Sequence, residues 1–446
     1  MSDIELSFET IIRKQPRYSE LFSYADGNQP LKYSTERLRE SFKAINVKFV
    51  QNWCSVVIES ALDRMQFRGW TSENKAINSA LEKLYTEQEI VLDSYDVHRS
   101  SLITSEAYII AWKDDTGTQV YYNDPRICHV FYEASNPKKA RFAAKMYKDE
   151  LSRWILTLYY PDHFEYYETR PMKNSPRSYK DFAPSEISSA PNDYGVIPVF
   201  HFRLNQRSHI GDLDNIITLQ DAVNKLLSDM MVSAEFSAFQ QRYVITDSET
   251  AVLKNAPNEI WSLPAGSSVG QFAATNLDNY LNSIDKIANS IAIISRTPKH
   301  YFYGSDSHVS GEALLAMEAP LTKKVTTRID NFSSTWTKLA KFLCLMNGIN
   351  VKDDEIKTVW EPAQSVQPYT EALTIKTLTD AGVPLKSALR MSGQTDKEIE
   401  QVERDKDEEE ANATTMATAL LDQARKNNEQ NNDPDQIMTA GTNADA

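Results

Sequence analysis

The stretch from Asp212 to Gln241 contains neither proline nor glycine, and its apolar residues recur at helical spacing. These residues are Leu213, Ile216, Leu219, Val223, Leu226, Met230 and Ala234. A helix of that extent is roughly 45 Å long, because each residue adds about 1.5 Å. One amphipathic helix of this length cannot bury its apolar stripe alone, so it needs a partner helix or a neighbouring subunit.

A short insertion and a second helical stretch follow this helix. Residues 243–275 hold short apolar runs broken by proline and glycine, which predict a small β-rich excursion. Apolar spacing predicts a second helix over residues 276–298, ended by Pro298. A polar loop with a glycine at each end then leads into a third long helix, which Ser310 caps and Pro320 kinks. This arrangement suits a hairpin that packs against neighbouring copies in a ring.

The N-terminal half mixes helices and strands. Helical spacing predicts a helix over residues 35–67 and further helical structure over residues 72–111. Residues 108–167 are rich in Val, Ile, Tyr and Phe and are punctuated by turn signals, so we expect strands there. The Pro- and Ser-rich residues 170–193 predict a surface loop, and small helices are expected over residues 369–410. The fold class is therefore α+β, mainly α.

Charge and cysteine content restrict the function. The chain has 62 acidic and 48 basic residues, which give a formal net charge of −14. A protein that grips nucleic acid by its phosphates needs clustered Lys and Arg, so this balance argues against such a grip but not against a channel for DNA. Cys54, Cys128 and Cys344 follow no metal or disulfide pattern and predict buried free thiols. Because no apolar run approaches the length of a bilayer span, we expect no membrane association.

The sequence shows no recognisable catalytic signature. The GxxxxGK[ST], GxGxxG and HExxH patterns are absent. Residues 266–270 fit GxSxG, but a nucleophile elbow needs a preceding strand and a following helix, whereas Pro264 precedes this string and a short apolar run follows it. The histidines are scattered singly, and each is expected to be a surface or core residue. We therefore expect no enzymatic activity, no cofactor and no metal site.

Five short segments are informative through their order and spacing. They are Asp124-Pro125-Arg126, residues 158–162, Ile197-Pro198-Val199, residues 211–236 and residues 304–315. Together they resemble the portal (head-to-tail connector) protein family of tailed double-stranded DNA bacteriophages, of the long-tailed-phage type. The resemblance extends from about Asn46 to Gly393. One departure is Glu106, since relatives tend to have a glycine before the Ala-Tyr pair, and it bears on the local turn geometry.

The resemblance implies a portal fold with a wing, a helical stem hairpin, a small β-containing clip and a helical crown. The expected boundaries are 1–205 for the wing, 206–242 for the first stem helix, 243–275 for the clip, 276–298 for the second stem helix, 299–311 for the tunnel loop, 312–362 for a long kinked wing helix and strand, 363–426 for the crown, and 427–446 for a disordered tail.

The resemblance also implies function and partners. Family members form a homo-oligomeric ring, usually a dodecamer, at one capsid vertex of the virion, assembled in the host cytoplasm. The ring is the channel for DNA packaging and ejection, and double-stranded DNA passes through it without sequence specificity. The implied partners are the major capsid protein, a scaffolding protein, the terminase large subunit, and a head-completion (adaptor) protein that precedes the tail.

Three groups of residues are candidates for sites in such a ring. The tunnel-loop candidates are Gly304, Ser305, Asp306, Ser307, His308, Val309, Ser310 and Gly311, and the stem channel-wall candidates are Asp212, Asp214, Asp221, Lys225 and Asp229. The clip candidates for terminase or adaptor docking are Glu249, Lys254, Asn258, Glu259 and Trp261. The tunnel loop has one full charge and no Lys or Arg, so its interaction energy with DNA changes little as the phosphates move past it. Its glycines supply backbone freedom.

Two other classes of protein remain as alternatives. The first is a non-channel capsid-associated scaffolding or structural protein, which would share the long helices but form no ring with a central hole. The second is a nucleic-acid enzyme of unrecognised type, which would need a clustered carboxylate or metal site. Electron microscopy of the purified protein separates the first alternative from a portal.

Overall fold

The computed structural model divides the chain into two compact units, Met1–Ala363 and Gln364–Ala446. It describes residues 1–30, 32, 50–205, 209–238, 242–246, 261–263, 265–273, 276–303, 311–352, 355–364, 368–392, 394 and 399–410.

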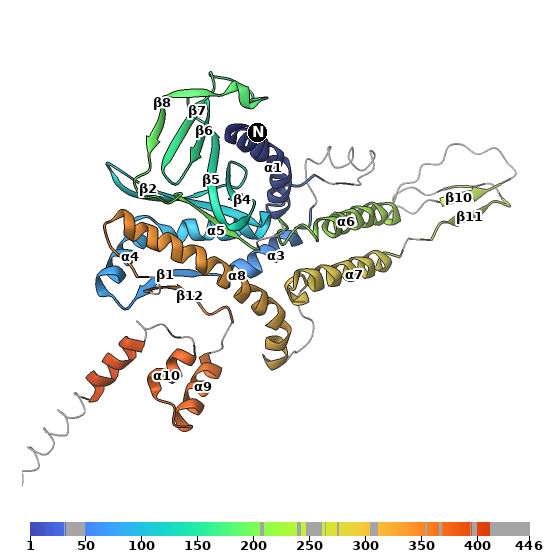
Figure 1. Ribbon diagram of the computed structural model, residues 1–446. Coiled ribbons are helices and arrows are strands. Elements are labelled where there is room, and N and C mark those ends of the chain that lie inside the picture. Colours follow the sequence, from blue (N-terminus) through green and yellow to red (C-terminus); the bar gives the residue numbers. More distant parts are fainter. Residues whose placement is uncertain are drawn as a thin grey trace, which may run out of the picture. The chain divides into compact units, whose positions relative to one another are not determined.

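The first unit mixes helices and strands along its whole length (Figure 1). Its helices are α1 (Asp3–Ala25), α3 (Trp53–Leu62), α4 (Lys75–Glu87), α5 (Ile90–Thr104), α6 (Ile217–Ala238), α7 (Asp278–Ser295) and α8 (Gly311–Met346), with 3-10 turns η1 (Tyr179–Asp181) and η2 (Lys299–Tyr301). Its strands are β1 (Phe67–Ser72), β2 (Glu106–Asp114), β3 (Gly117–Asn123), β4 (Cys128–Glu133), β5 (Asn136–Lys148), β6 (Trp154–Tyr159), β7 (His163–Glu168), β8 (Ala183–Pro191), β9 (Val199–Arg203), β10 (Arg242–Ile245), β11 (Ser268–Gln271) and β12 (Ile356–Trp360).

Within the described ranges the strands form antiparallel sheets of different sizes. The largest has the order β4-β5-β6-β7-β8, and a three-stranded sheet has the order β3-β2-β9, which leaves β9 at an edge. Two pairs, β1-β12 and β10-β11, complete the set. The strands predicted over residues 108–167 are therefore confirmed.

The three-stranded sheet is buried on both faces along β2. Alternate residues of a strand point to opposite faces. Ala107 and Ile109 join the core that contains α5, whereas Tyr108 and Ile110 pack in a second cluster with Val130 of the five-stranded sheet. This double burial explains the continuous apolar run of β2, since a strand covered on both faces shows no polar alternation.

Trp336 of α8 lies in the largest core and connects three separate parts of the chain. Its ring stacks on Phe67 of β1 with centroids 4.2 Å apart. Its indole Nε1 donates to Nε2 of His98 at 2.9 Å, and Trp70 Nε1 donates to its backbone carbonyl at 3.0 Å. Burial lowers the pKa of His98 to about 3, so the imidazole is neutral and can accept this bond. Trp336 itself is fully buried.

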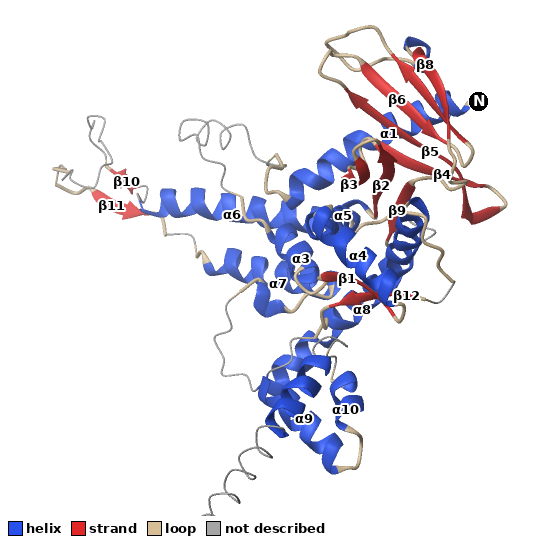
Figure 2. Cartoon of the chain, turned by 90° about the vertical axis from the view of Figure 1, so that its left-hand side faces the viewer, coloured by secondary structure: helices blue, strands red, loops and turns tan. Residues whose placement is uncertain are grey.

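The predicted helical hairpin is present. Helices α6 and α7 run side by side, and β10 and β11 lie beyond their ends (Figures 1 and 2). Helix α6 begins at Ile217, five residues after the predicted start, because Asp212 to Ile216 form turns. Helix α7 ends before Pro298, as predicted, with Arg296 in the left-handed region at φ 58°. Ser233 and Tyr280 join the two helices through their hydroxyls at 3.0 Å.

Helix α8 runs through Pro320 without interruption, and its axis changes direction in Figure 1. Proline removes one backbone hydrogen bond and crowds the preceding turn, which bends a helix. The predicted cap Ser310 lies outside the described residues.

Two helical predictions in the N-terminal half were too long. The helix predicted over 35–67 is described only as α3, since residues 33–49 lie outside the described set and Phe67 already pairs with Trp360 in a β-ladder. The stretch 72–111 contains two helices and the start of β2. The helices separate at Glu89, whose φ of 48° is left-handed. The spacing of apolar residues did not reveal where these helices end, because short buried strands and buried helices contain the same residue types.

The loop predicted over residues 170–193 was also wrong in part. It contains η1 and then β8, which pairs with β7 as the outer strand of the five-stranded sheet. Nearly all side chains of β8 are exposed. A strand with little burial carries no apolar alternation, so the sequence pattern gave no signal for it. In the GxSxG string, Gly266 lies in a turn with φ +93° and β11 follows, so no helix continues it.

The second unit is helical where it is described. It contains α9 (Pro368–Asp380), α10 (Leu385–Met391) and helical residues 399–410. Ala388, Leu389 and Ile399 are buried, and Lys386 pairs with Glu403 at 2.9 Å. Small helices were predicted for this region.

Replacing Trp336 with alanine is expected to lower the free energy of unfolding by about 3–5 kcal/mol, because it opens a cavity and leaves His98 without its donor. The control is Trp112→Ala, since the Trp112 side chain is 46% exposed and a surface change costs about 0.5 kcal/mol or less. Denaturant unfolding followed by circular dichroism measures both. Equal losses for the two variants would show that the Trp336 core is not central to stability.

Candidate functional site

The three groups of candidate residues differ in how many of their members lie among the described residues. The tunnel-loop candidates Gly304 to Ser310 lie outside the described residues, and Gly311 is the first residue of α8. Four clip candidates, Glu249, Lys254, Asn258 and Glu259, also lie outside them. The stem acids and Trp261 are described, and their geometry follows.

Asp212 is held inside the chain by two cations of α8. Its carboxylate lies 2.8 Å from Lys324 Nζ and 3.0 Å from Arg328 Nη2. The Asp212 and Lys324 side chains are both buried. This ion pair fixes the start of the α6 segment to α8, so the Asp212 charge is neutralised within the subunit.

Asp214 and Asp221 are bound by α1 in the same way. Arg17 donates to Asp214 Oδ1 at 2.5 Å, and the Tyr24 hydroxyl donates to Asp221 Oδ1 at 2.7 Å. Burial raises the pKa of Asp221, against the hydrogen bond from Tyr24 and the charge of Lys32 at 3.8 Å. Three of the four acids named as channel-wall candidates therefore anchor the α6 segment to neighbouring helices of its own chain.

Lys225 and Asp229 lie farther along α6 and remain accessible. Lys225 Nζ lies 2.5 Å from Asp229 Oδ2 in an i,i+4 pair, and both side chains are partly exposed. Such a pair contributes about 0.3–0.5 kcal/mol to a helix. These two residues are the channel-wall candidates whose charge is still available to solvent.

The β10–β11 hairpin has an apolar surface. Tyr243, Ile245, Val269 and Phe272 are all well exposed, and the rings of Tyr243 and Phe272 lie 5.4 Å apart. Gly270 is required opposite Tyr243, because a Cβ there would come within 2.3 Å of the tyrosine ring. Exposed apolar and aromatic side chains thus gather on this antiparallel strand pair.

Trp261 is half-buried beside this hairpin. The guanidinium of Arg242 lies over its ring at 5.8 Å. It is the clip candidate for which the structure gives a contact.

The α6–α7 hairpin also leaves apolar side chains uncovered. On α7, Ile284, Ala288 and Ile291 are buried, whereas Leu281 and Ile293 are 52% and 70% exposed. An apolar stripe wider than one helix partner can cover needs a second partner. The hairpin therefore has one face for its own chain and another for a further surface.

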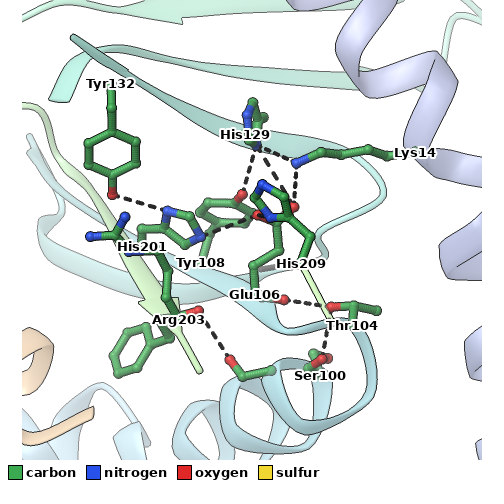
Figure 3. A network of polar contacts seen from close by, with 12 residues as sticks. Lys14, Ser100, Thr104, Glu106, Tyr108, His129, Tyr132, His201, Arg203 and His209 are labelled. Atoms are coloured by element: carbon green, nitrogen blue, oxygen red, sulfur yellow. Dashed lines mark hydrogen bonds and ion pairs between the residues drawn. The ribbon is translucent and has the colours of Figure 1, made fainter. Parts of the chain in front are cut away.

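A buried polar cluster around Glu106 was not found from the sequence (Figure 3). Glu106 Oε1 accepts from Lys14 Nζ at 2.5 Å and from the Tyr18 hydroxyl at 2.6 Å. Its other oxygen lies 3.4 Å from Nε2 of His201 and 3.8 Å from Nδ1 of the exposed His209. The cluster joins α1, β2 and β9 at one buried carboxylate.

The donors and acceptors fix the histidine tautomers. An ammonium can only donate, so His129 Nδ1 accepts from Lys14 at 2.8 Å and its proton is on Nε2. A carboxylate can only accept, so His201 Nε2 carries the proton that faces Glu106. Its Nδ1 then accepts from the Tyr132 hydroxyl at 3.1 Å. At 3.4 Å the His201 contact is an electrostatic one, since the geometry misses that of a good hydrogen bond.

Charge in this cluster is concentrated on one ion pair. Burial would raise the pKa of Glu106, but the Lys14 ammonium and His201 hold it well below its usual value. Burial lowers the pKa of His129 to about 3 and that of His201 to about 4, so both rings are neutral near pH 7. The cluster contains one carboxylate and one ammonium, and within the described residues no group of three His, Cys, Asp or Glu is placed to hold a metal.

The backbone at Glu106 accommodates a glutamate without strain. The left-handed residue is Ser105, with φ 73°, while Glu106 starts β2 and pairs with Arg203 of β9. The available sequence signal was a single acid directly before the apolar run of β2. That signal does not identify the partners of Glu106, because they come from positions about 90 residues away on either side, which no local pattern contains.

A comparison with family models matches residues 10–414 to the family described as phage portal protein, SPP1 Gp6-like. Among curated proteins, the portal proteins of Mycobacterium phage L5 and Mycobacterium phage D29 are each 26% identical to the chain, over 263 and 262 residues. Each alignment covers 53% of this chain and 54% of the phage protein. The chain thus spans about half the length of the curated relatives it matches.

Two solved structures of gene transfer agent particles are also similar. The neck of an empty particle matches with a TM-score of 0.49 and 12% identity, over 81% of this chain and 95% of that one. A chain from the virion of a native particle matches with a TM-score of 0.46 and 11% identity, over 85% and 99%. Among the described residues, no helix is both long and apolar enough to cross a membrane.

Replacing Glu106 with glutamine is expected to cost about 3–5 kcal/mol of unfolding free energy, because it leaves the Lys14 ammonium buried without a counter-charge. Adding Lys14→Met should recover most of that loss, since the pair is then removed as a whole. Thermal and urea unfolding measure both variants, with the exposed Asp115→Asn as control. If the double variant were as unstable as Glu106→Gln, the cost would not arise from the unpaired ammonium.

Proposed function

The chain belongs to the phage portal proteins of the SPP1 Gp6-like family, and on that premise we propose that it is one subunit of a ring that forms the DNA channel at a capsid vertex. The ring, which we propose to be a dodecamer, serves for packaging of double-stranded DNA into the capsid and for its ejection. It is a component of the virion, assembled in the host cytoplasm, with no catalytic role of its own.

The observation that carries this proposal is the α6–α7 hairpin with its uncovered apolar face. Ile293 and Leu281 project from α7 and are not covered within the described part of the chain. In a ring, each hairpin would pack against the next and bury these side chains, which makes a tube of paired helices. The exposed Lys225 and Asp229 are the residues of α6 that we propose for the channel wall.

We assign the portal regions to the described elements on this basis. The proposed wing is residues 1–205 together with residues 312–362, which contain most of α8. The stem is residues 206–242 and 276–298, which contain α6 and α7. The clip is residues 243–275, which contain β11 and most of β10, and the crown is residues 363–426. The exposed Tyr243 and Phe272 make the clip suitable for docking the terminase large subunit and then a head-completion protein. The major capsid protein and a scaffolding protein are the further partners proposed.

The tunnel loop, Gly304 to Gly311, is proposed to project into the channel. Its support is composition, since Asp306 is its one fully charged residue and it has no Lys or Arg. A basic loop repeated around a ring would bind phosphates at many points and slow the DNA.

Ring formation is tested with Ile293→Asp. Because the Ile293 side chain is 70% exposed, the monomer should fold normally, while a carboxylate placed in a packed helical interface should prevent assembly. Light scattering gives the mass of the assembly, and electron microscopy shows whether it is a ring with a central hole.

The matched control is Ile187→Asp, which makes the same change at a 71% exposed isoleucine of β8 and should leave the ring intact. Filaments or monomers formed by the unmodified protein would contradict the portal proposal and favour a non-channel capsid-associated protein.

The loop is tested by Ser307→Lys combined with His308→Lys. We expect rings to form as usual and packaged DNA per particle to fall, since added cations bind the phosphates that pass. DNA content after nuclease treatment of particles is the readout, and Ser307→Thr is the conservative control. Normal DNA content in the lysine variant would remove the role assigned to this loop.

A further inference from the structure

A groove opens between the edge strand β9, the C-terminal half of α8 and the β4–β5 hairpin. Its volume is about 1300 Å³, which exceeds the roughly 300–1,000 Å³ of pockets for small molecules. Its apolar lining, called the apolar floor below, includes Val196 and Leu345, which are 41% and 48% exposed, beside the buried Val130 and Phe342. A groove of this size suits a segment of protein.

The charge of this groove is opposite to that of the chain. Its lining has six cationic residues and one acid, Asp330, whereas the whole chain has 48 basic and 62 acidic residues. The cations are Lys138, Lys139, Arg203, Arg328, Lys338 and Lys341. Lys139 pairs with Glu133 and Arg328 with Asp212. Lys138 and Lys338 are exposed, and neither has an ion pair within the part of the chain that the structure describes.

The edge of β9 adds backbone donors to the groove. Ala111 N–H donates to Pro198 O at 3.0 Å and Leu204 N–H to Ser105 O at 3.1 Å. In an antiparallel ladder the intervening residues direct their backbone groups away from the partner strand. The N–H groups of His201 and Arg203 therefore face the open edge, and no described residue accepts from them. Cations and free N–H groups together require an occupant rich in acceptors and negative charge.

The same chain carries such a segment in its second unit. Helical residues 399–410 hold seven acidic and two basic residues, and all their side chains except that of Ile399 are exposed. Val402, Asp405 and Glu409 share one helix face, because they are three and seven residues apart. An apolar residue among carboxylates matches an apolar floor with a cationic rim.

We infer that the acidic helix of residues 399–410 of one copy docks in the β9–α8 groove of the neighbouring copy. The inference rests on the proposed ring, in which each subunit meets its two neighbours through different surfaces. A closed ring needs such a complementary pair, and these two surfaces supply opposite charge and matching apolar contact. Nucleic acid is the weaker candidate, because a phosphate backbone would use the cations but neither the apolar floor nor the strand edge.

Cross-linking between copies tests this directly. The native cysteines Cys54, Cys128 and Cys344 are buried, so thiols introduced at Lys338 and Glu409 are the reactive ones. In assembled rings of Lys338→Cys/Glu409→Cys, a short bis-maleimide should give a ladder of covalent oligomers on a denaturing gel. The control pair Ser189→Cys/Glu409→Cys places the first thiol on exposed β8, away from the groove, and should give no ladder.

A charge exchange separates specific docking from misfolding. For this experiment the thiol pair is Ser334→Cys/Glu408→Cys, which leaves Lys338 and Glu409 free for charge changes. In that background, Lys138→Glu and Lys338→Glu should reduce cross-linking between copies several-fold. Adding Asp405→Lys and Glu409→Lys should restore it, whereas Lys173→Glu/Lys352→Glu, which reverses exposed charges outside the groove, should have no effect.

The outcomes are distinct from those for the ring itself. Rings with a central hole but no ladder, or cross-links only within single chains, would overturn this inference and leave the portal proposal standing. If the unmodified protein bound a double-stranded DNA oligonucleotide and the Lys138→Glu/Lys338→Glu variant did not, the groove would be assigned to nucleic acid instead. Absence of rings in the unmodified protein would overturn both proposals.

Discussion

The ion pair between Lys14 and Glu106 connects the N-terminal helix α1 to both larger sheets. Removing two charges from water costs several kcal/mol per ion, and this cost is offset only where the remaining donors and acceptors are satisfied. Tyr18 of α1 donates to Glu106 and His129 of β4 accepts from Lys14, while His201 of β9 makes an electrostatic contact with the other Glu106 oxygen at 3.4 Å. The pair therefore specifies how the N-terminal helix and the two larger sheets meet, because a different arrangement would leave a charge buried and unpaired.

The acids at the start of α6 follow the same rule. The sequence made the stem acids candidates for a channel wall, yet Asp212, Asp214 and Asp221 are bound by cations or hydroxyls of their own chain. Their charge is used to fix the hairpin on the body of the subunit. If α6 lines a channel, as we propose, the charge of the channel wall depends on residues nearer the C-terminal end of α6, such as Lys225 and Asp229.

The surfaces that remain unsatisfied are the ones that a ring would use. The exposed apolar side chains of α7, the aromatic β10–β11 pair, and Lys138 and Lys338 in the groove beside β9 each lack a partner of the required kind among the described residues. Exposed apolar area and unpaired strand edges are unfavourable for an isolated chain. A subunit with three such surfaces is consistent with a protein whose stable form is an assembly, as its family membership implies.

The sequence by itself determined the long helices, the turn-rich strands and the lack of known catalytic motifs, because helical and strand periodicity are local properties of the chain. It could not determine where buried helices end or that the weakly buried β8 is a strand. It also could not determine which partners the acidic side chains near α6 bind. Only the tertiary structure placed Lys14, Glu106 and His201 together, and only it placed six cations along one groove of an acidic chain. Those features depend on contacts between residues that are far apart in sequence, and a charge acquires its role from the partner that the fold brings to it.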